Sequence, residues 1–181
     1  MPGRLGHRFF NRPTVKVARG LLGCYLMRKV GSRLVCARIT ETEAYVGPND
    51  KASHASRGRT PRTEVMFGPP GYLYVYLVYG MYHCLNVVTE EEGYPAAVLI
   101  RSVEVISPRQ GKVISGPGRL CRALKISKRL NGQDIVTSRG VWFERGVLRK
   151  GEKIVTGKRI GVPYAGTWQY KPWRFWIKKE G

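Results

Sequence analysis

Apolar positions near the start of the chain predict a short amphipathic helix. Val15, Ala18, Leu21 and Leu22 recur at intervals that place them along one helical face. A polar, proline-containing stretch precedes them, as is typical of a helix start. Gly23 should end the helix, because glycine readily adopts the left-handed backbone found after a last helical turn.

Two extended runs over residues 24–30 and 33–45 follow this helix, and Gly31-Ser32 between them is typical of a hairpin turn. Side chains alternate along a strand. One face of the second run is therefore expected to carry Ile39, Glu41, Glu43 and Tyr45, with the intervening residues on the other face.

Residues 46–70 are polar and rich in glycine, proline and arginine, so we expect a long surface loop, a kind of segment that often has a functional role. Residues 72–78 alternate tyrosine with leucine and valine, and a second extended run covers residues 82–88. Tyr79-Gly80-Met81 lies between the two runs. This pattern predicts a protruding β-hairpin.

The remaining pattern predicts a strand over residues 95–106, a short helix after Gly116-Pro117-Gly118, and short strands and turns from residue 132 onward. No internal repeat, low-complexity stretch or linker divides the chain. The expected fold class is α+β: one compact domain over residues 1–181, with an antiparallel-rich curved sheet and a few short helices.

Composition indicates a polyanionic partner. The 32 Lys and Arg residues exceed the 12 Asp and Glu residues, which gives a net charge of +20 and a pI of about 10.3. The cations are spread along the whole chain, so the folded body itself should attract phosphate backbones.

No apolar run reaches the ~18 residues of a membrane span, and we expect an intracellular protein that does not associate with membranes. The short stretch before the first helix favours a prokaryotic source, and for such a source we expect a cytoplasmic, nucleoid-associated protein. A monomer is also expected.

The four cysteines lie too far apart in the sequence for a zinc-ligand spacing, so we expect no metal site. In an intracellular protein, scattered cysteines are usually buried, reduced side chains that behave as small apolar residues.

Glu41 and Glu43 supply acidic chemistry within this basic chain. Residues two apart on a strand lie roughly 6.6 Å apart along the backbone, a separation close to that of the paired carboxylates of glycosidases. The same spacing also arises on any strand with alternating, solvated or salt-bridged glutamates. Cationic surroundings would keep a carboxylate ionised, as a base that activates water requires.

Half of the 10 tyrosines lie in one 11-residue window, at positions 72, 74, 76, 79 and 82. Tyrosine favours half-buried strands, which accounts for each residue taken singly. Together, beside a basic loop, they favour stacking on nucleic-acid bases. His54 and Asn86 taken alone are typical of a surface residue and a hydrogen-bonding strand residue.

The order of several motifs resembles one known family. These motifs are Arg38-Ile39-Thr40-Glu41-Thr42-Glu43-Ala44-Tyr45, His54, Thr60-Pro61-Arg62, Met66-Phe67, Leu73-Tyr74-Val75-Tyr76, Tyr79-Gly80-Met81-Tyr82, Asn86, Leu99-Ile100-Arg101, Gly116-Pro117-Gly118-Arg119-Leu120-Cys121, Arg159-Ile160-Gly161-Val162 and Tyr164-Ala165-Gly166. Over nearly the whole chain, the sequence resembles the alkyladenine (3-methyladenine) DNA glycosylases.

The resemblance implies an enzyme of base-excision repair that hydrolyses the N-glycosidic bond of a damaged purine in double-stranded DNA. Glu43 would be the general base that activates water, and Arg101 would help to position this water and the carboxylate. The implied enzyme is monofunctional, without a lyase step, and requires no cofactor. 3-Methyladenine is the implied substrate, and hypoxanthine and ethenoadenine are further candidates.

The resemblance also assigns a pocket for a base flipped out of the duplex. Tyr45, His54 and Tyr76 would stack on this base, and Asn86 would exclude the exocyclic amine of guanine. Tyr79 would intercalate into the DNA. A wedge and a stacking pocket together offset the few kcal/mol of stacking and pairing lost on flipping.

Two alternative functions remain open from the sequence. A non-enzymatic nucleic-acid-binding protein would account for the basic charge and the tyrosines, but it gives Glu43 no role. A glycosidase that uses Glu41 and Glu43 together would account for the acidic pair, but the net charge of +20 disfavours a neutral sugar substrate.

Overall fold

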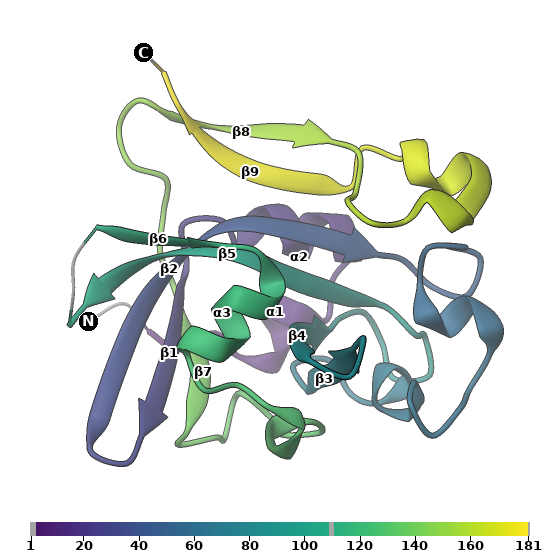
Figure 1. Ribbon diagram of the computed structural model, residues 1–181, viewed down its shortest axis with the longest axis horizontal. Helices are drawn as coiled ribbons and strands as arrows, with labels where there is room; N and C mark the ends of the chain where they lie inside the picture. Colours follow the sequence, from purple (N-terminus) through teal and green to yellow (C-terminus); the bar gives the residue numbers. More distant parts are fainter. Residues whose placement is uncertain (1–2, 109–110, 181) are drawn as a thin grey trace.

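A curled antiparallel sheet of nine strands forms the centre of the computed structural model, which describes residues 3–108 and 111–180 (Figure 1). The strands are β1 (Tyr25–Val30), β2 (Arg33–Tyr45), β3 (Leu73–Val78), β4 (Tyr82–Val88), β5 (Ala97–Ser107), β6 (Lys112–Ser115), β7 (Val141–Glu144), β8 (Glu152–Gly157) and β9 (Arg174–Lys179). The main order is β3-β4-β5-β2-β1-β7, and β6 pairs with β5. This arrangement confirms the α+β fold with a curved, antiparallel-rich sheet.

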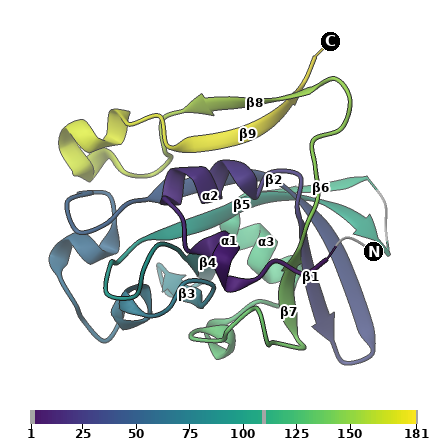
Figure 2. The same ribbon diagram turned by 180° about the vertical axis from the view of Figure 1, so that it is seen from behind.

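Short helices flank the sheet. α1 (His7–Phe10) and α2 (Thr14–Gly20) face the viewer in Figure 2, whereas α3 (Pro117–Ala123) faces the viewer in Figure 1. The described residues also form four 3-10 helices: η1 (His54–Arg57), η2 (Glu64–Phe67), η3 (Lys128–Leu130) and η4 (Pro163–Tyr170). No helix in the described part of the chain is long and apolar enough to cross a membrane.

Strand β2 is central because it has partners on both edges. β5 pairs along one edge, and the other edge is divided between β1, which covers residues 33–38, and β9, which covers residues 41–43. The C-terminal hairpin of β8 and β9 therefore joins the sheet beside the two glutamates of β2. Residues far apart in the sequence meet at this place.

The predicted helices and hairpins are largely confirmed. α2 begins at Thr14, the β1–β2 and β3–β4 hairpins turn where the sequence predicts, and α3 follows Gly116. Leu73 and Val75 pack in the main core, while Tyr74 and Tyr76 belong to a second cluster on the opposite side of the strand. α1 and β6 were not predicted, because each spans only four residues.

The predicted face of β2 is wrong at Ile39. The pairing of β2 with β5 slips three times, and the two slips that follow Ile39 leave Thr40 without a partner on β5 and Arg101 without one on β2. Each such bulge reverses the alternation of side chains. Ile39 therefore packs in the main core with Ala44, instead of sharing a face with Glu43.

The segment between β2 and β3 is not the exposed loop that its polar composition predicts. It contains the two short helices η1 and η2, and Asp50, Ser53 and Thr63 are buried within it. Their side chains bond to nearby backbone N–H groups, which is how a polar segment satisfies its buried groups without a strand or a long helix.

Burial of the cysteines agrees with their predicted role as small apolar residues. Cys24, Cys84 and Cys121 are buried, Cys36 is partly exposed, and none of the four forms a disulfide. Removal from water disfavours a thiolate, and burial raises the pKa of each thiol above its ordinary value.

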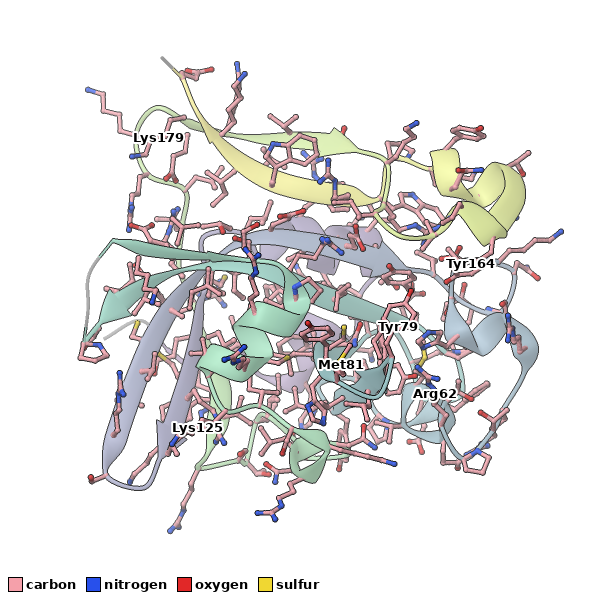
Figure 3. All side chains as sticks on the ribbon, in the orientation of Figure 1. Arg62, Tyr79, Met81, Lys125, Tyr164 and Lys179 are labelled. Atoms are coloured by element: carbon pink, nitrogen blue, oxygen red, sulfur yellow. The ribbon has the colours of Figure 1, made fainter. Side chains whose placement is uncertain are left out.

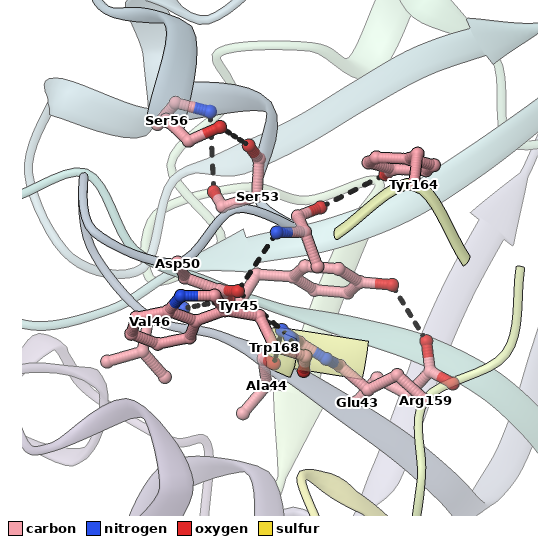
Figure 4. A network of polar contacts seen from close by, with 12 residues as sticks. Glu43, Ala44, Tyr45, Val46, Asp50, Ser53, Ser56, Arg159, Tyr164 and Trp168 are labelled. Carbon is pink, nitrogen blue, oxygen red and sulfur yellow. Dashed lines mark hydrogen bonds and ion pairs between the residues drawn. The ribbon is translucent and has the colours of Figure 1, made fainter. Parts of the chain in front are cut away.

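A buried ion pair joins the segment after β2 to the segment after β8. Arg159 donates through both terminal nitrogens to Asp50, and neither side chain is exposed to solvent. The same guanidinium donates to the carbonyl oxygens of Ala44 at 3.0 Å and Trp168 at 3.1 Å (Figure 4). Arg159 thus holds three parts of the chain together.

Replacing this arginine should destabilise the protein strongly. Arg159→Met leaves the Asp50 carboxylate buried without its cation, which costs about 3–5 kcal/mol of unfolding free energy. Urea denaturation monitored by tryptophan fluorescence measures the change. The matched control is Arg59→Met, which breaks the exposed pair with Glu64 and should leave the urea midpoint unchanged. Equal effects of the two variants would show that the buried pair does not hold these segments.

Candidate active site

One row of residues crosses four strands on the same face of the sheet. Glu43 of β2 pairs with Leu99 of β5, Leu99 pairs with Asn86 of β4, and Asn86 pairs with Tyr74 of β3. Residues directly opposite each other in a sheet project to the same side. The strand register therefore brings Glu43, Asn86 and the tyrosines to one place.

A pocket with a volume of about 450 Å³ lies over this row. Six of the seven site residues predicted from the sequence line it: Tyr45, His54, Tyr76, Tyr79, Asn86 and Arg101. Figure 3 shows Tyr79, Arg62 and Tyr164, which also line the pocket, on one side of the molecule. They come from the β3–β4 turn, the segment between β2 and β3, and η4.

Aromatic rings form one wall of the pocket. The His54 and Tyr76 ring centroids are 4.6 Å apart in an edge-to-face arrangement, and those of Tyr74 and Tyr76 are 5.1 Å apart. The Arg62 guanidinium lies 5.1 Å from the Tyr76 centroid. These side chains pack tightly against one another, and together they present aromatic ring surfaces to the pocket interior.

The imidazole of His54 is held in its neutral form. Burial and the nearby cations Arg62 and Arg57 lower the pKa of His54 to about 4. A hydrogen bond of 3.0 Å joins its Nδ1 atom to the Tyr74 hydroxyl. At neutral pH this ring therefore adds no positive charge to the pocket wall.

Glu43, the seventh predicted residue, lies directly beneath the pocket and is completely buried. Its Oε2 atom accepts hydrogen bonds from the Tyr45 hydroxyl at 2.9 Å and from Arg101 Nη1 at 3.3 Å. The Oε1 atom accepts from the Ile160 backbone N–H at 2.8 Å. Tyr45, Arg101 and Ile160 all line the pocket, so the carboxylate is one side chain away from its interior.

Opposing influences act on the pKa of Glu43. Burial raises this pKa above the ordinary glutamate value, whereas Arg101, the Ile160 N–H and the Tyr45 hydroxyl lower it. The net direction is upward. Burial and the adjacent carboxylate raise the pKa of Tyr45 well above its ordinary value, so Tyr45 remains a hydroxyl donor to Glu43.

Arg101 binds both glutamates of β2. Its Nε atom donates to Glu41 Oε1 at 3.2 Å while Nη1 donates to Glu43. Arg174 of β9 donates to the same Glu41 oxygen at 3.3 Å. The side chains of Glu41 and Glu43 are thus bridged by an arginine, instead of facing each other across an open cleft.

Asn86 lies in the pocket lining and is buried. Its side-chain amide donates to the Tyr74 carbonyl at 3.1 Å, which fixes the orientation of the amide across the β3–β4 pair. The hydrogen-bonding role that is usual for a strand asparagine is therefore confirmed, and the same side chain still meets the pocket interior.

Tyr79 projects from the tip of the β3–β4 hairpin and is 88% exposed. Tyr79 and Gly80 have φ angles of 51° and 68°, and Met81 N–H bonds to the Val78 carbonyl at 3.1 Å, as in a type I′ turn. A left-handed backbone costs a tyrosine roughly 1 kcal/mol or more. The turn therefore presents a large aromatic ring to solvent at the edge of the pocket.

Three further residues of this site have no role predicted from the sequence. The Ile160 main-chain N–H binds Glu43, Arg159 fixes the Ile160 segment, and Tyr164 lines the pocket. All three lie in motifs that carry the family resemblance, which was the available signal. The role of Ile160 could not be inferred from its side chain, because every residue except proline has a backbone N–H.

The described residues contain no cluster of three or more His, Cys, Asp or Glu side chains that could hold a metal ion. Hydrogen-bonding groups and ring surfaces are what the pocket offers to a ligand. A cationic protein with an aromatic pocket beside an exposed tyrosine has the features of a nucleic-acid-binding protein.

The chain belongs to the methylpurine-DNA glycosylase family, whose sequence model matches residues 8–181. A relative from Methanocella arvoryzae is 52% identical over 95% of this chain and 91% of its own length. Relatives from Desulfitobacterium hafniense and Myxococcus xanthus are 46% and 47% identical, over 97% and 96% of this chain and 95% and 90% of their own lengths. All three are provisionally named 3-methyladenine DNA glycosylases.

The neutral state of His54 can be tested by NMR. The imidazole signals of His54 should titrate with a midpoint at about 4. Arg62→Ala should raise this midpoint, because one of the cations that oppose protonation is removed. As a matched control, Arg33→Ala at the distant β1–β2 turn should leave the midpoint unchanged. A wild-type midpoint near the unperturbed value of ~6.5 would contradict the burial of this ring.

Proposed function

We propose that the protein is a DNA glycosylase of base-excision repair that removes alkylated purines, 3-methyladenine among them, from double-stranded DNA. The observation that carries the proposal is the buried Glu43 carboxylate, held by donors from three places in the chain directly beneath an aromatic pocket. Family membership and the names of the relatives support the same reaction.

The pocket would receive a purine that has rotated out of the duplex. Tyr79 would fill the space left in the base stack, and Tyr45, His54 and Tyr76 would contact the flipped base. A methylated purine such as 3-methyladenine is cationic, and ring faces attract a cation by about 0.5–2 kcal/mol. Asn86 would act as a steric gate against the exocyclic amine of guanine.

Glu43 would act as a general base. A carboxylate has about four acceptor sites, and the donors from Tyr45, Arg101 and Ile160 occupy three, so one remains for a water molecule. As the water oxygen bonds to C1′ of the sugar, the N-glycosidic bond breaks and its electron pair leaves with the base. The water proton passes to Glu43, which leaves a free base and an abasic site.

The reaction proposed here is hydrolysis alone. A cationic base is already a good leaving group, so the enzyme needs to supply an activated water and a negative charge beside the developing positive charge of the sugar. Hypoxanthine and ethenoadenine, which are also planar purines, are proposed as further substrates. Borohydride should trap no covalent protein–DNA adduct, and a trapped adduct would show a lyase step.

Base release measures the proposed activity directly. We expect free methylated bases from methylated genomic DNA, and alkali-labile sites in duplexes that carry hypoxanthine or ethenoadenine but not in undamaged duplexes. Glu43→Gln should lower the single-turnover rate by roughly 10²–10⁴-fold, the usual contribution of a general base. Binding to lesion-bearing duplexes should remain close to that of the wild type.

The matched control is Glu64→Gln, which removes an exposed carboxylate of η2 and should leave the rate unchanged. Undiminished release by Glu43→Gln would remove this residue from the mechanism. No release by the wild type from any of these DNAs, together with salt-sensitive binding, would instead support a non-enzymatic DNA-binding protein.

A further inference from the structure

Five exposed cations follow one another along α3 and the turns after it. This group, which we call the α3 ridge, comprises Arg119, Arg122, Lys125, Lys128 and Arg129. Within the described residues, none of their side chains forms a hydrogen bond or an ion pair. Elsewhere on the surface, by contrast, Arg59, Arg149 and Lys153 each pair with a glutamate.

The sequence around the α3 ridge keeps its charge uncompensated. Residues 111–133 contain no Asp or Glu. Arg28 caps the end of α3 by donating to the carbonyl oxygens of Leu124 and Lys125, each at 3.1 Å. These bonds hold Lys125 in a left-handed backbone conformation, with φ of 50°, and so fix the turn that joins the two halves of the ridge.

The α3 ridge adjoins the hairpin that carries Tyr79. A side chain at Gly118 would come within 3.0 Å of the Tyr82 ring, which shows how closely α3 approaches β4. Between the two elements lies a groove of about 400 Å³, lined by residues that include Met81 and Arg122. In Figure 3, Met81 and Tyr79 lie between Lys125 and Arg62, so cations flank the hairpin on both sides.

We propose that the α3 ridge binds the phosphate backbone of duplex DNA beside the hairpin, on the side away from Arg62. This inference rests on the proposed function for the identity of the polyanion. Unpaired surface cations bind phosphates through the release of counterions. Such contacts set the orientation of a protein on the duplex without reading its sequence. The ridge would thereby hold the duplex while Tyr79 probes the base stack.

The salt dependence of binding tests the α3 ridge. Affinity for an undamaged duplex is measured by fluorescence anisotropy over a series of NaCl concentrations, for the wild type and for Arg122→Ala/Lys125→Ala. Each lost phosphate contact should reduce the slope of log affinity against log salt by ~0.9. The double variant should therefore lose up to ~1.8 in slope, and up to roughly 60-fold in affinity at ~0.1 M salt.

The matched control is Arg8→Ala/Lys16→Ala, which removes the same charge from exposed positions on α1 and α2. These helices face the viewer in Figure 2, which shows the molecule from behind. Their double variant should keep the wild-type slope. Equal losses in the two double variants would show that only net charge matters and would overturn the proposal, as would no loss in the ridge variant.

Excision at saturating enzyme separates this proposal from the proposed function. Base release by the wild type is measured at an enzyme concentration that saturates the DNA. An inactive wild type with a ridge-dependent salt slope would refute the glycosylase and leave the ridge intact. An active wild type whose salt slope does not depend on the ridge would refute the ridge proposal and leave the glycosylase intact.

A separate observation concerns Glu41, which the proposed reaction does not use directly. Arg101 lies between Glu41 and Glu43, and Arg174 binds Glu41 from the other side. Charges therefore alternate in a row from Arg174 to Glu43. Glu41 and Arg101 are only 15% and 12% exposed, so water screens these interactions weakly.

We propose that Glu41 is a positioning residue. It holds the Arg101 guanidinium against Glu43, and it competes with Glu43 for the positive charge of Arg101. A guanidinium fixed at one end by Glu41 has fewer orientations available at its other end. The groups that face Glu43 come from several elements: Glu41 and Tyr45 from β2, Cys84 from β4, Arg101 from β5, the Ile160 N–H after β8, and Arg174 from β9.

Removing the charge of Glu41 should make Glu43 easier to ionise. The negative charge of Glu41 raises the pKa of Glu43, so Glu41→Gln should lower that pKa and shift the acidic limb of the excision rate to lower pH. The rate above this limb should fall, because Arg101 loses one of its two anchors. If Glu41 were needed only for folding, Glu41→Gln would lower the excision rate without shifting its acidic limb.

Side-chain ¹³C NMR of the free protein measures the Glu43 midpoint without relying on excision. Arg174→Gln is the complementary variant, which leaves the Glu41 charge less compensated and should move the midpoint in the opposite direction. An unchanged or raised midpoint in Glu41→Gln would overturn the proposal. If Glu41→Gln does not fold, an unchanged midpoint in Arg174→Gln would overturn it equally.

Discussion

The buried Glu43 carboxylate is the constraint around which the site is arranged. Removing an ionised carboxylate from water costs several kcal/mol unless other groups replace its hydration. Here the replacements come from Tyr45 on the same strand, Arg101 on β5 and the Ile160 N–H after β8. Because these donors are far apart in the sequence, the carboxylate receives all three hydrogen bonds only when the sheet and the C-terminal segment are both folded.

The paired slips of β2 and β5 show what a sequence pattern can and cannot predict. Runs of alternating residues correctly predicted the two hairpins and the strands that carry the site. The bulges at Thr40 and Arg101 depend on how two strands align, so no pattern within one strand could reveal them. Ile39 was therefore assigned to the wrong face, although its burial is ordinary for an isoleucine.

The residues of the site could be predicted from the sequence to different degrees. The family resemblance named the side chains that meet in the pocket, and the tyrosine-rich window alone indicated the aromatic wall. The complete burial of Glu43 and its bond to a main-chain N–H could not be read from the residue order, since both arise from tertiary contacts. The composition of residues 46–70 was misleading for the same reason: buried Asp50 is satisfied by Arg159, more than 100 positions away.

Burial of the cysteines has a consequence for chemical durability. Methylating agents that damage purines also attack thiolates, which are much stronger nucleophiles than thiols. Burial raises the pKa of Cys24, Cys36, Cys84 and Cys121, so each sulfur remains protonated at neutral pH. Cys84 lines the base pocket itself. A repair enzyme built in this way would keep its cysteine thiols in their less reactive form under the conditions that create its substrates.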